Sequence, residues 1–121
     1  MATLDFKWRR SRVPAILQTE SAECGLACLA MVASAHGLDT DLATLRRRFS
    51  MSLKGVTLVE LVRMADALQL ASRPLRAELG QIEHLRTPCV LHWDMNHFVV
   101  LVSVRRGVAL IHDPAHGERR L

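Results

Sequence analysis

The longest apolar stretch of the chain covers residues 24–35, where small and aliphatic side chains occupy every side of a helical projection. Apolar residues on all faces are typical of a helix that is surrounded by other elements. Gly37 follows at the position where a left-handed C-terminal cap is expected. The pattern therefore predicts a central buried helix over residues 24–36, and the run is too short to cross a bilayer.

Amphipathic helices are predicted after it. Asp39 or Thr40 can cap a short helix over residues 41–49, whose arginines fall in the last turn and suit the negative end of the helix dipole. Thr57 and Glu60 then form a capping box, which marks the start of another helix. Apolar residues recur there at the spacing of one helical face: Leu58, Leu61, Val62, Ala65 and Leu68.

From residue 71 onward the period of the apolar pattern changes to two, as it does in strands. Residues 71–78 predict a strand at the edge of a sheet, because Pro74 has no N–H to donate to a neighbouring strand. Residues 80–86 predict a short helical turn, and residues 88–93 predict a buried strand. This half of the chain is therefore expected to build a sheet.

Residues 97–104 and 108–113 predict a β-hairpin, whose loop ends in a glycine that can adopt a positive φ angle. A three-residue loop, 105–107, would pair Val104 with Val108. Because the helices come first and the strands second, the chain is predicted to belong to the α+β class, with N-terminal helices packed on a C-terminal antiparallel sheet.

The register of this hairpin separates the six histidines. With the three-residue loop, Val99 faces Asp113, and His97 is the diagonal neighbour of Asp113 on the same face. His112 has the opposite parity and is expected to point to the other side. His92 could reach a site from its own strand, but pairing gives it no acidic partner. The other histidines look like helix-end or surface residues: His36, His84 and His116.

The three cysteines, at positions 24, 28 and 89, fit neither a disulfide framework nor a paired zinc site. A thiol in the first turn of a helix lies at the positive end of the helix dipole, which favours the nucleophilic thiolate. Cys24 occupies this position. Cys28 and Cys89 are better explained as small buried hydrophobes. Cys24 is therefore the candidate nucleophile, and His97 with Asp113 is the candidate base and its carboxylate.

The polar segment ahead of Cys24 supplies a further candidate. Gln18 can return its side-chain amide towards the thiol, where it would donate to the oxyanion of an acyl intermediate. Glu20 and Glu23 are interpreted as charges that suit the start of a helix rather than as catalytic acids.

The length of 121 residues fits one domain, and its 50% of hydrophobic residues are enough for a core. Residues 1–12 lack periodicity and are expected to be a flexible lead-in, with the folded domain over residues 13–121. The net charge is +4, with arginines clustered in residues 7–12, 46–48 and 118–120. Such clusters can bind nucleic acid, but aromatic residues are only 4% and provide no stacking platform. Solvated surfaces are the better interpretation, and nucleic acid is not expected as a partner.

Three segments together resemble a known family: QTESAECGLACLAMV, LHWDMNHFVVLVSV and HDPAHG. They are similar to the bacteriocin-processing cysteine peptidase domain at the N-terminus of peptidase-containing ABC transporters, above all to its colicin V secretion branch. The resemblance runs from about residue 13 to the last residue, with the segments in family order. It implies a papain-like fold, with Cys24 as the nucleophile, His97 as the base, Asp113 as the orienting acid and Gln18 in the oxyanion hole.

The resemblance also implies an enzyme that cuts a bacteriocin or microcin precursor after the Gly-Gly pair that ends its leader, coupled to export. The implied peptidase needs no metal or cofactor, and ATP is used by a nucleotide-binding domain that this chain lacks. The implied partners are the leader peptide and the transmembrane and ATPase domains of the same transporter. The chain would then be an excised domain, soluble by itself, from the cytoplasmic face of the bacterial inner membrane.

Alternatives from other functional classes remain. Relatives that have lost the cysteine are non-catalytic leader-binding modules of ABC exporters, and this chain argues against that reading by keeping the complete residue set. A thiol-redox or metal-binding role for Cys24 and Cys28 is weaker, because their spacing offers only two ligands.

Overall fold

The computed structural model describes residues 12–49, 55–93 and 97–121. The helical elements come first: the 3-10 helix η1 (Ser21–Glu23), the α-helices α2 (Cys24–Ala35), α3 (Leu42–Arg48) and α4 (Leu58–Ala67), and the 3-10 helix η2 (Leu79–His84). The strands follow: β1 (Cys89–Trp93), β2 (His97–Arg105), β3 (Val108–Asp113) and β4 (Gly117–Arg120). They form an antiparallel sheet in the order β1-β2-β3-β4, which confirms the predicted α+β class. Of the expected lead-in, only Arg12 lies within the described residues.

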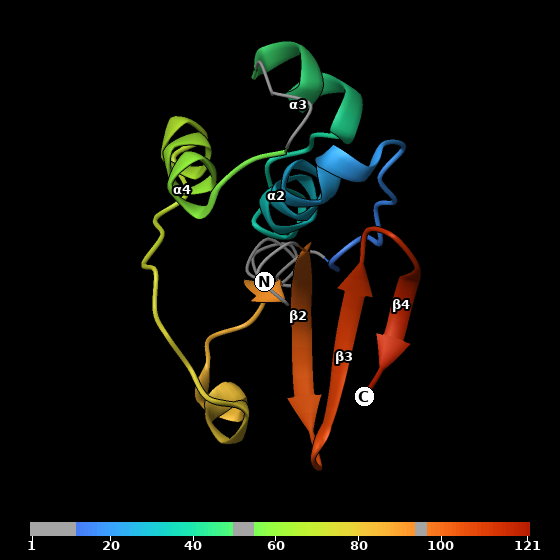
Figure 1. Cartoon of the computed structure of the whole chain (residues 1–121), viewed down its shortest axis with the longest axis vertical. Coiled ribbons are helices and arrows are strands. Elements are labelled where there is room, and N and C mark those ends of the chain that lie inside the picture. The colour runs from blue at the N-terminus through green and yellow to red at the C-terminus, as the bar shows by residue number, and fades with distance from the viewer. Residues whose placement is uncertain (1–11, 50–54, 94–96) are drawn as a thin grey trace, which may run out of the picture.

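Helix α2 lies at the centre of the molecule, between the other helices and the sheet (Figure 1). Leu26, Met31 and Cys28 on this helix are fully buried, so the predicted central helix is confirmed. It ends at Ala35, and Gly37 has the positive φ angle, 93°, that the expected cap requires. Because α2 is buried on every side, its hydrophobic surface holds α3, α4 and the sheet in one body.

The unbroken apolar run FVVLV, residues 98–102, lies in strand β2. Phe98 and Val100 belong to the core cluster around α2, whereas Val99 and Leu101 belong to a second cluster with residues of β3. Residues of the segment around η2, Ile82 among them, pack against this second cluster. Both faces of the strand are therefore buried, which removes the alternation of polar and apolar residues that a half-exposed strand shows.

The helix caps partly follow the prediction. Helix α3 is capped by Asp41, whose carboxylate accepts a hydrogen bond from the Thr44 N–H at 2.8 Å, and not by Asp39 or Thr40. The predicted Thr57–Glu60 capping box of α4 is present.

The buried face of α4 differs from the prediction at its first residue. Leu58 is 42% exposed, because the first turn extends beyond the core, and Met64 occupies the buried face instead. Leu61, Ala65 and Leu68 are buried as predicted.

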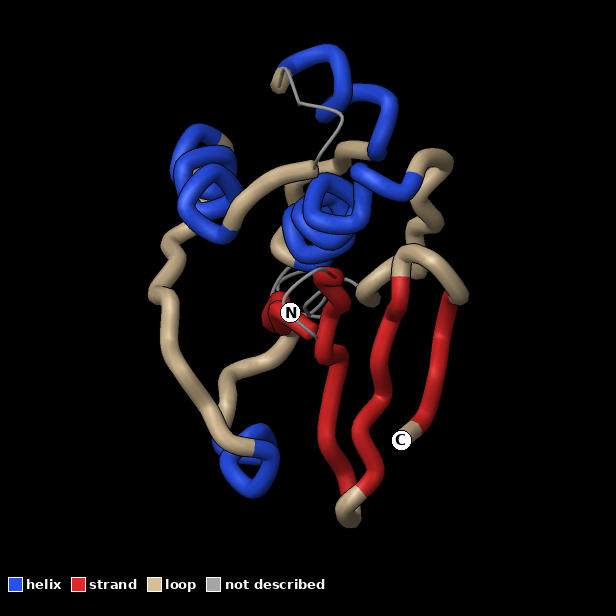
Figure 2. The backbone as a smooth tube through the Cα atoms, in the orientation of Figure 1, coloured by secondary structure: helices blue, strands red, loops and turns tan. Residues whose placement is uncertain are grey.

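The predicted strand over residues 71–78 is wrong. The segment has no regular structure, is exposed throughout, and runs beside the body from α4 to η2 (Figure 2). Pro74 cannot donate to a ladder, and no strand of the sheet pairs with this segment. Strand β4 was not predicted, since its residues GERR are polar and only pair at the sheet edge. The helical turn of η2 and a strand at β1 are confirmed. The prediction that this strand is buried is wrong, because its first three residues are half-buried and His92 and Trp93 are exposed.

In the β2–β3 hairpin the predicted loop length is wrong, but the predicted register at the end far from the loop is correct. Arg105 pairs with Val108, so the loop has two residues, Arg106 and Gly107, both with positive φ angles (52° and 78°), as a type I′ turn needs. A β-bulge between Leu101 and Ser103 then shifts the register by one residue.

Beyond the bulge Val100 pairs with His112. Continuation of this register sets Val99 opposite Asp113, as the three-residue loop had predicted. The bulge thus compensates for the shorter loop, and the predicted parity of His97 and Asp113 holds.

Gly25 allows α2 to approach the sheet closely. A Cβ atom at this position would lie 2.5 Å from Val56 Cγ2 and 3.2 Å from Phe98 Cδ2. Phe98 is 3% exposed and follows His97 at the start of β2. The absence of a side chain at Gly25 therefore sets the distance between the first turn of α2, which carries Cys24, and the start of β2, which carries His97.

Replacement of Gly25 by alanine is expected to destabilise the domain by about 1–3 kcal/mol, because crowding in the core outweighs the better helix propensity of alanine. Urea unfolding measures this. Gly80→Ala is the matched control, since a Cβ there meets nothing within 4 Å. Equal stability of the two variants would show that α2 has room to spare at Phe98.

Candidate active site

The imidazole of His97 contacts the carboxylate of Asp113. His97 Nε2 and Asp113 Oδ1 are 2.6 Å apart, so an N–H at Nε2 donates to the carboxylate. His97 begins β2 and Asp113 ends β3, and the antiparallel register brings these ends together. Asp113 is 5% exposed, which protects the contact from water. Because Nε2 is engaged, Nδ1 is the ring nitrogen left to exchange a proton with another group.

Asp113 is held by more groups than the sequence indicated. Its Oδ1 also accepts the backbone N–H of Ala115 at 2.8 Å, and His116 Nδ1 lies 3.2 Å from its Oδ2. Arg119 Nη1 lies 3.7 Å from Oδ2. Burial alone would raise the pKa of Asp113, but hydrogen bonds from His97, Ala115 and His116 outweigh it and lower that pKa. The carboxylate is therefore ionised and fixed in orientation at neutral pH.

His116 was interpreted as a surface residue, and its side chain is indeed 69% exposed. Its contact with Asp113 was missed. The spacing of three residues across the turn from β3 to β4 was the available signal, because an Asp at the start of a turn commonly bonds groups two or three residues later.

The segment ahead of α2 is fixed to the same end of the sheet. The backbone N–H of Gln18 donates to the carbonyl oxygen of Pro114 at 2.9 Å, and Pro114 directly follows Asp113. In the described part of the chain, the Gln18 Oε1 atom is buried without a hydrogen-bond partner. A buried polar atom of this kind is costly unless a ligand or water satisfies it. Gln18 thus has hydrogen-bonding capacity that the fold does not use.

Cys24 is the first residue of α2 and is 7% exposed. Cys28, one turn further along, is fully buried, and burial raises the pKa of its thiol well above the ordinary value, with smaller contributions from the charges of Cys24 and Asp113. Burial also raises the pKa of Cys89. Since the thiolate is the nucleophile, neither Cys28 nor Cys89 is suited to attack a substrate.

The other histidines lie elsewhere. His112 contacts the Pro14 carbonyl oxygen and Glu118, and it is buried on the side predicted from its parity. His92 stacks on Phe98, with ring centroids 4.4 Å apart. His36 caps the end of α2 and His84 is exposed in η2, as predicted.

The described ranges contain no cluster of three or more His, Cys, Asp or Glu side chains that could hold a metal ion. A hollow of about 400 Å³ lies at the C-terminal end of α2, lined among others by Ser34, Gly37 and Thr40. It is at the opposite end of this helix from Cys24. Within residues 12–49, 55–93 and 97–121, no helix is both long and apolar enough to span a membrane.

Known proteins similar to this chain include bacterial secretion proteins. The chain is 53% identical over 116 residues to the colicin V secretion/processing ATP-binding protein CvaB of Escherichia coli, covering 96% of this chain and 16% of that protein. It is 52% identical over 118 residues to a probable microcin-H47 secretion/processing ATP-binding protein, MchF, also of Escherichia coli, covering 98% of this chain and 17% of that protein. The chain therefore spans about a sixth of the length of these curated relatives.

Solved structures share the fold. The crystal structure of a double glycine motif protease from an AMS/PCAT transporter, in complex with the leader peptide, matches with a TM-score of 0.83 and 33% identity over 94% of this chain and 82% of that chain. The peptidase domain of Streptococcus ComA matches with a TM-score of 0.76 and 23% identity over 91% of this chain and 86% of that chain. The expected papain-like fold is confirmed. With the Peptidase C39 family model matching residues 12–121, the chain belongs to the Peptidase C39 family.

Proposed function

We propose that this chain is a cysteine endopeptidase that removes the leader from a bacteriocin or microcin precursor by cleaving after a Gly-Gly pair. The observation that carries the proposal is the contact of His97 with the buried carboxylate of Asp113, which lies at the end of the sheet to which the Gln18 backbone is bonded. Membership of the Peptidase C39 family and the 33% identity to a double glycine motif protease support the same reaction.

In the proposed mechanism, His97 Nδ1 takes the proton of the Cys24 thiol, while Asp113 holds the Nε2–H tautomer and stabilises the imidazolium. Cys24 Sγ attacks the carbonyl carbon of the second glycine. The peptide C–N bond then breaks, His97 returns the proton to the leaving amine, and a thioester to the leader remains. Water, deprotonated by His97, cleaves the thioester, which releases the leader carboxylate and restores the thiol.

Gln18 would stabilise the tetrahedral intermediates of both steps through its side-chain N–H groups. The bond from its backbone to Pro114 ties this residue to the segment that carries Asp113. The donors in this role are the N–H groups at Nε2, while the buried Oε1 atom, which has no partner among the described residues, can only accept.

The wider setting is part of the proposal. Residues 13–121 would be the peptidase domain, and residues 1–12 a lead-in. The names of CvaB and MchF, secretion/processing ATP-binding proteins, suggest that the natural protein also carries an ATP-binding domain and exports the cleaved cargo, and we infer transmembrane domains from such export. The peptidase would then lie at the cytoplasmic face of the bacterial inner membrane, bind the leader peptide, and use no cofactor of its own, with ATP used by the nucleotide-binding domain.

Cys24→Ala is expected to abolish cleavage of a peptide that joins a Gly-Gly leader to a short cargo segment, because the attacking sulfur is lost. Cys28→Ala should still cleave, since that thiol is buried and its raised pKa keeps it protonated. Mass spectrometry of the products and calorimetry of leader binding distinguish the outcomes. A wild-type domain that binds the leader without cleaving it would be a leader-binding module and not a peptidase.

His97→Ala should abolish turnover, and Asp113→Asn should lower kcat by about two orders of magnitude or more, because an amide does not fix the productive imidazole tautomer. His92→Gln is the control, since His92 is exposed, stacks on Phe98 and has no acidic partner among the described residues. Steady-state kinetics measure these effects. Normal turnover of His97→Ala, or a strong loss of turnover in His92→Gln, would show that His97 is not the base.

A further inference from the structure

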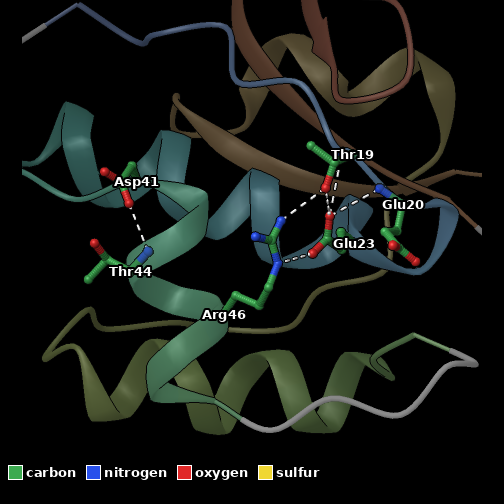
Figure 3. Close-up of polar contacts among 6 residues, drawn as sticks. All are labelled: Thr19, Glu20, Glu23, Asp41, Thr44 and Arg46. Carbon is green, nitrogen blue, oxygen red and sulfur yellow. Dashed lines mark hydrogen bonds and ion pairs between the residues drawn. The ribbon is translucent and has the colours of Figure 1, made fainter.

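The residue before the candidate nucleophile is a buried carboxylate. Glu23 is 5% exposed, although a carboxylate loses much free energy when it leaves water unless several donors surround it. Figure 3 shows these donors around Glu23. Its Oε1 accepts from the Thr19 hydroxyl at 2.7 Å, the Thr19 N–H at 3.2 Å and the Glu20 N–H at 3.1 Å. Its Oε2 accepts from Nε of Arg46. A carboxylate that only suits the start of a helix would not need these four hydrogen bonds.

Three of these side chains close a ring. Arg46 Nη2 donates to the Thr19 hydroxyl oxygen at 3.0 Å, while its Nε donates to Glu23, and the Thr19 hydroxyl donates to Glu23 (Figure 3). We call Thr19, Glu23 and Arg46 the Glu23 ring. Arg46 comes from α3, which is anchored in the core through Leu42 and Leu45. The ring therefore fastens the segment ahead of α2 to a separate helix.

The ring spans the chain between two candidate site residues. Thr19 directly follows Gln18, and Glu23 directly precedes Cys24. Within this segment the Glu23 N–H also donates to the Glu20 carbonyl oxygen at 3.0 Å. The side chains of the ring thus add contacts to α3 along the path from Gln18 to Cys24. Catalysis is sensitive to such geometry, because a misplacement of about 1 Å can cost a hundredfold in rate.

We propose that Glu23, Thr19 and Arg46 are positioning residues that fix the Gln18 amide relative to the Cys24 sulfur. The inference rests on the proposed peptidase function and adds residues that act through Gln18 and not on the substrate.

The ring remains ionised under assay conditions. The hydrogen bond from Arg46, together with those from Thr19 and Glu20, lowers the pKa of Glu23 to about 2 despite its burial. A lowered pKa means that the carboxylate stays charged above this value, and that its contribution to stability is complete above the ordinary pKa of 4.5 and is lost as the pH falls from there to about 2. The ring is therefore a permanent support, and its variants should change the height of the pH–rate profile while keeping its shape.

The first test compares neighbouring arginines of α3. With a leader peptide that ends in Gly-Gly and continues into a few cargo residues, Arg46→Gln is expected to lower kcat by about tenfold to a hundredfold with little change in KM. Arg46→Lys should recover part of the loss. Arg47→Gln is the matched control, because Arg47 is exposed and contacts only the Thr44 hydroxyl on its own helix, at 3.4 Å, in the described structure. An equal loss in both glutamine variants, or a loss confined to KM, would overturn the proposal.

The second test asks whether the ring acts through Gln18. In a Gln18→Ala background, Arg46→Gln should have little further effect on kcat, because the group that it positions is absent. If Arg46→Gln costs the same factor with and without Gln18, the ring does not position that residue.

Hydrogen exchange of the backbone provides a readout that does not need activity. Arg46→Gln should speed exchange in the peptide that covers residues 18–24, and Arg47→Gln should leave it unchanged. If the wild-type domain fails to cleave, the proposed function is wrong, yet the exchange data still decide whether the ring holds the segment. Unchanged exchange in Arg46→Gln would refute the positioning role even in an active enzyme.

Discussion

The close packing of α2 against β2 is the constraint on which the rest of the structure depends. Gly25 presents no side chain where Phe98 and Val56 come nearest, so the first turn of the helix can lie against the start of the strand. In the sequence, Cys24 directly precedes Gly25 and His97 directly precedes Phe98. The same packing buries all of α2 except Val32 and Ser34, which are half-buried, and α2 then holds α3 and α4 in place. The packing that fills the core therefore also sets the spacing between the candidate site residues Cys24 and His97.

Asp113 organises the opposite side of the site. It orients His97 through one oxygen and is held by His116 and Arg119 through the other. The next residue, Pro114, accepts the backbone N–H of Gln18, so the carboxylate and the segment before α2 are fixed together. Separate parts of the sequence thus converge on one end of the sheet, where each is supported by bonds to another.

Much of this arrangement could be predicted because local chemistry and tertiary structure agree. The all-apolar helix with Gly37 after it and the Thr57 capping box specify their elements within a few residues. The pairing of His97 with Asp113 was also correct, but through two deviations that cancel. The loop of the hairpin is one residue shorter than predicted, and a β-bulge restores the register; nothing in the strand pattern distinguishes these from a three-residue loop.

The missed features depend on tertiary contacts. A polar segment such as GERR becomes a strand only because β3 offers it an edge, and the segment around Pro74 has no partner. Glu23 and Arg46 are 23 residues apart in the sequence, so their ion pair leaves no local pattern. The contact between His116 and Asp113 leaves a local signal in the sequence, because only a single turn separates the two residues.

We propose above all that Cys24, supported by His97, attacks the carbonyl after a double glycine. A leader peptide that ends in a Gly-Gly chloromethyl ketone tests it directly, because the reagent labels a thiolate that lies at the cleavage position. Tandem mass spectrometry should find one label per domain, on Cys24, formed much faster than with the matched peptide that ends in Gly-Val and strongly slowed in His97→Ala. A label on Cys28 or Cys89, or equal rates with both peptides, would contradict the claim.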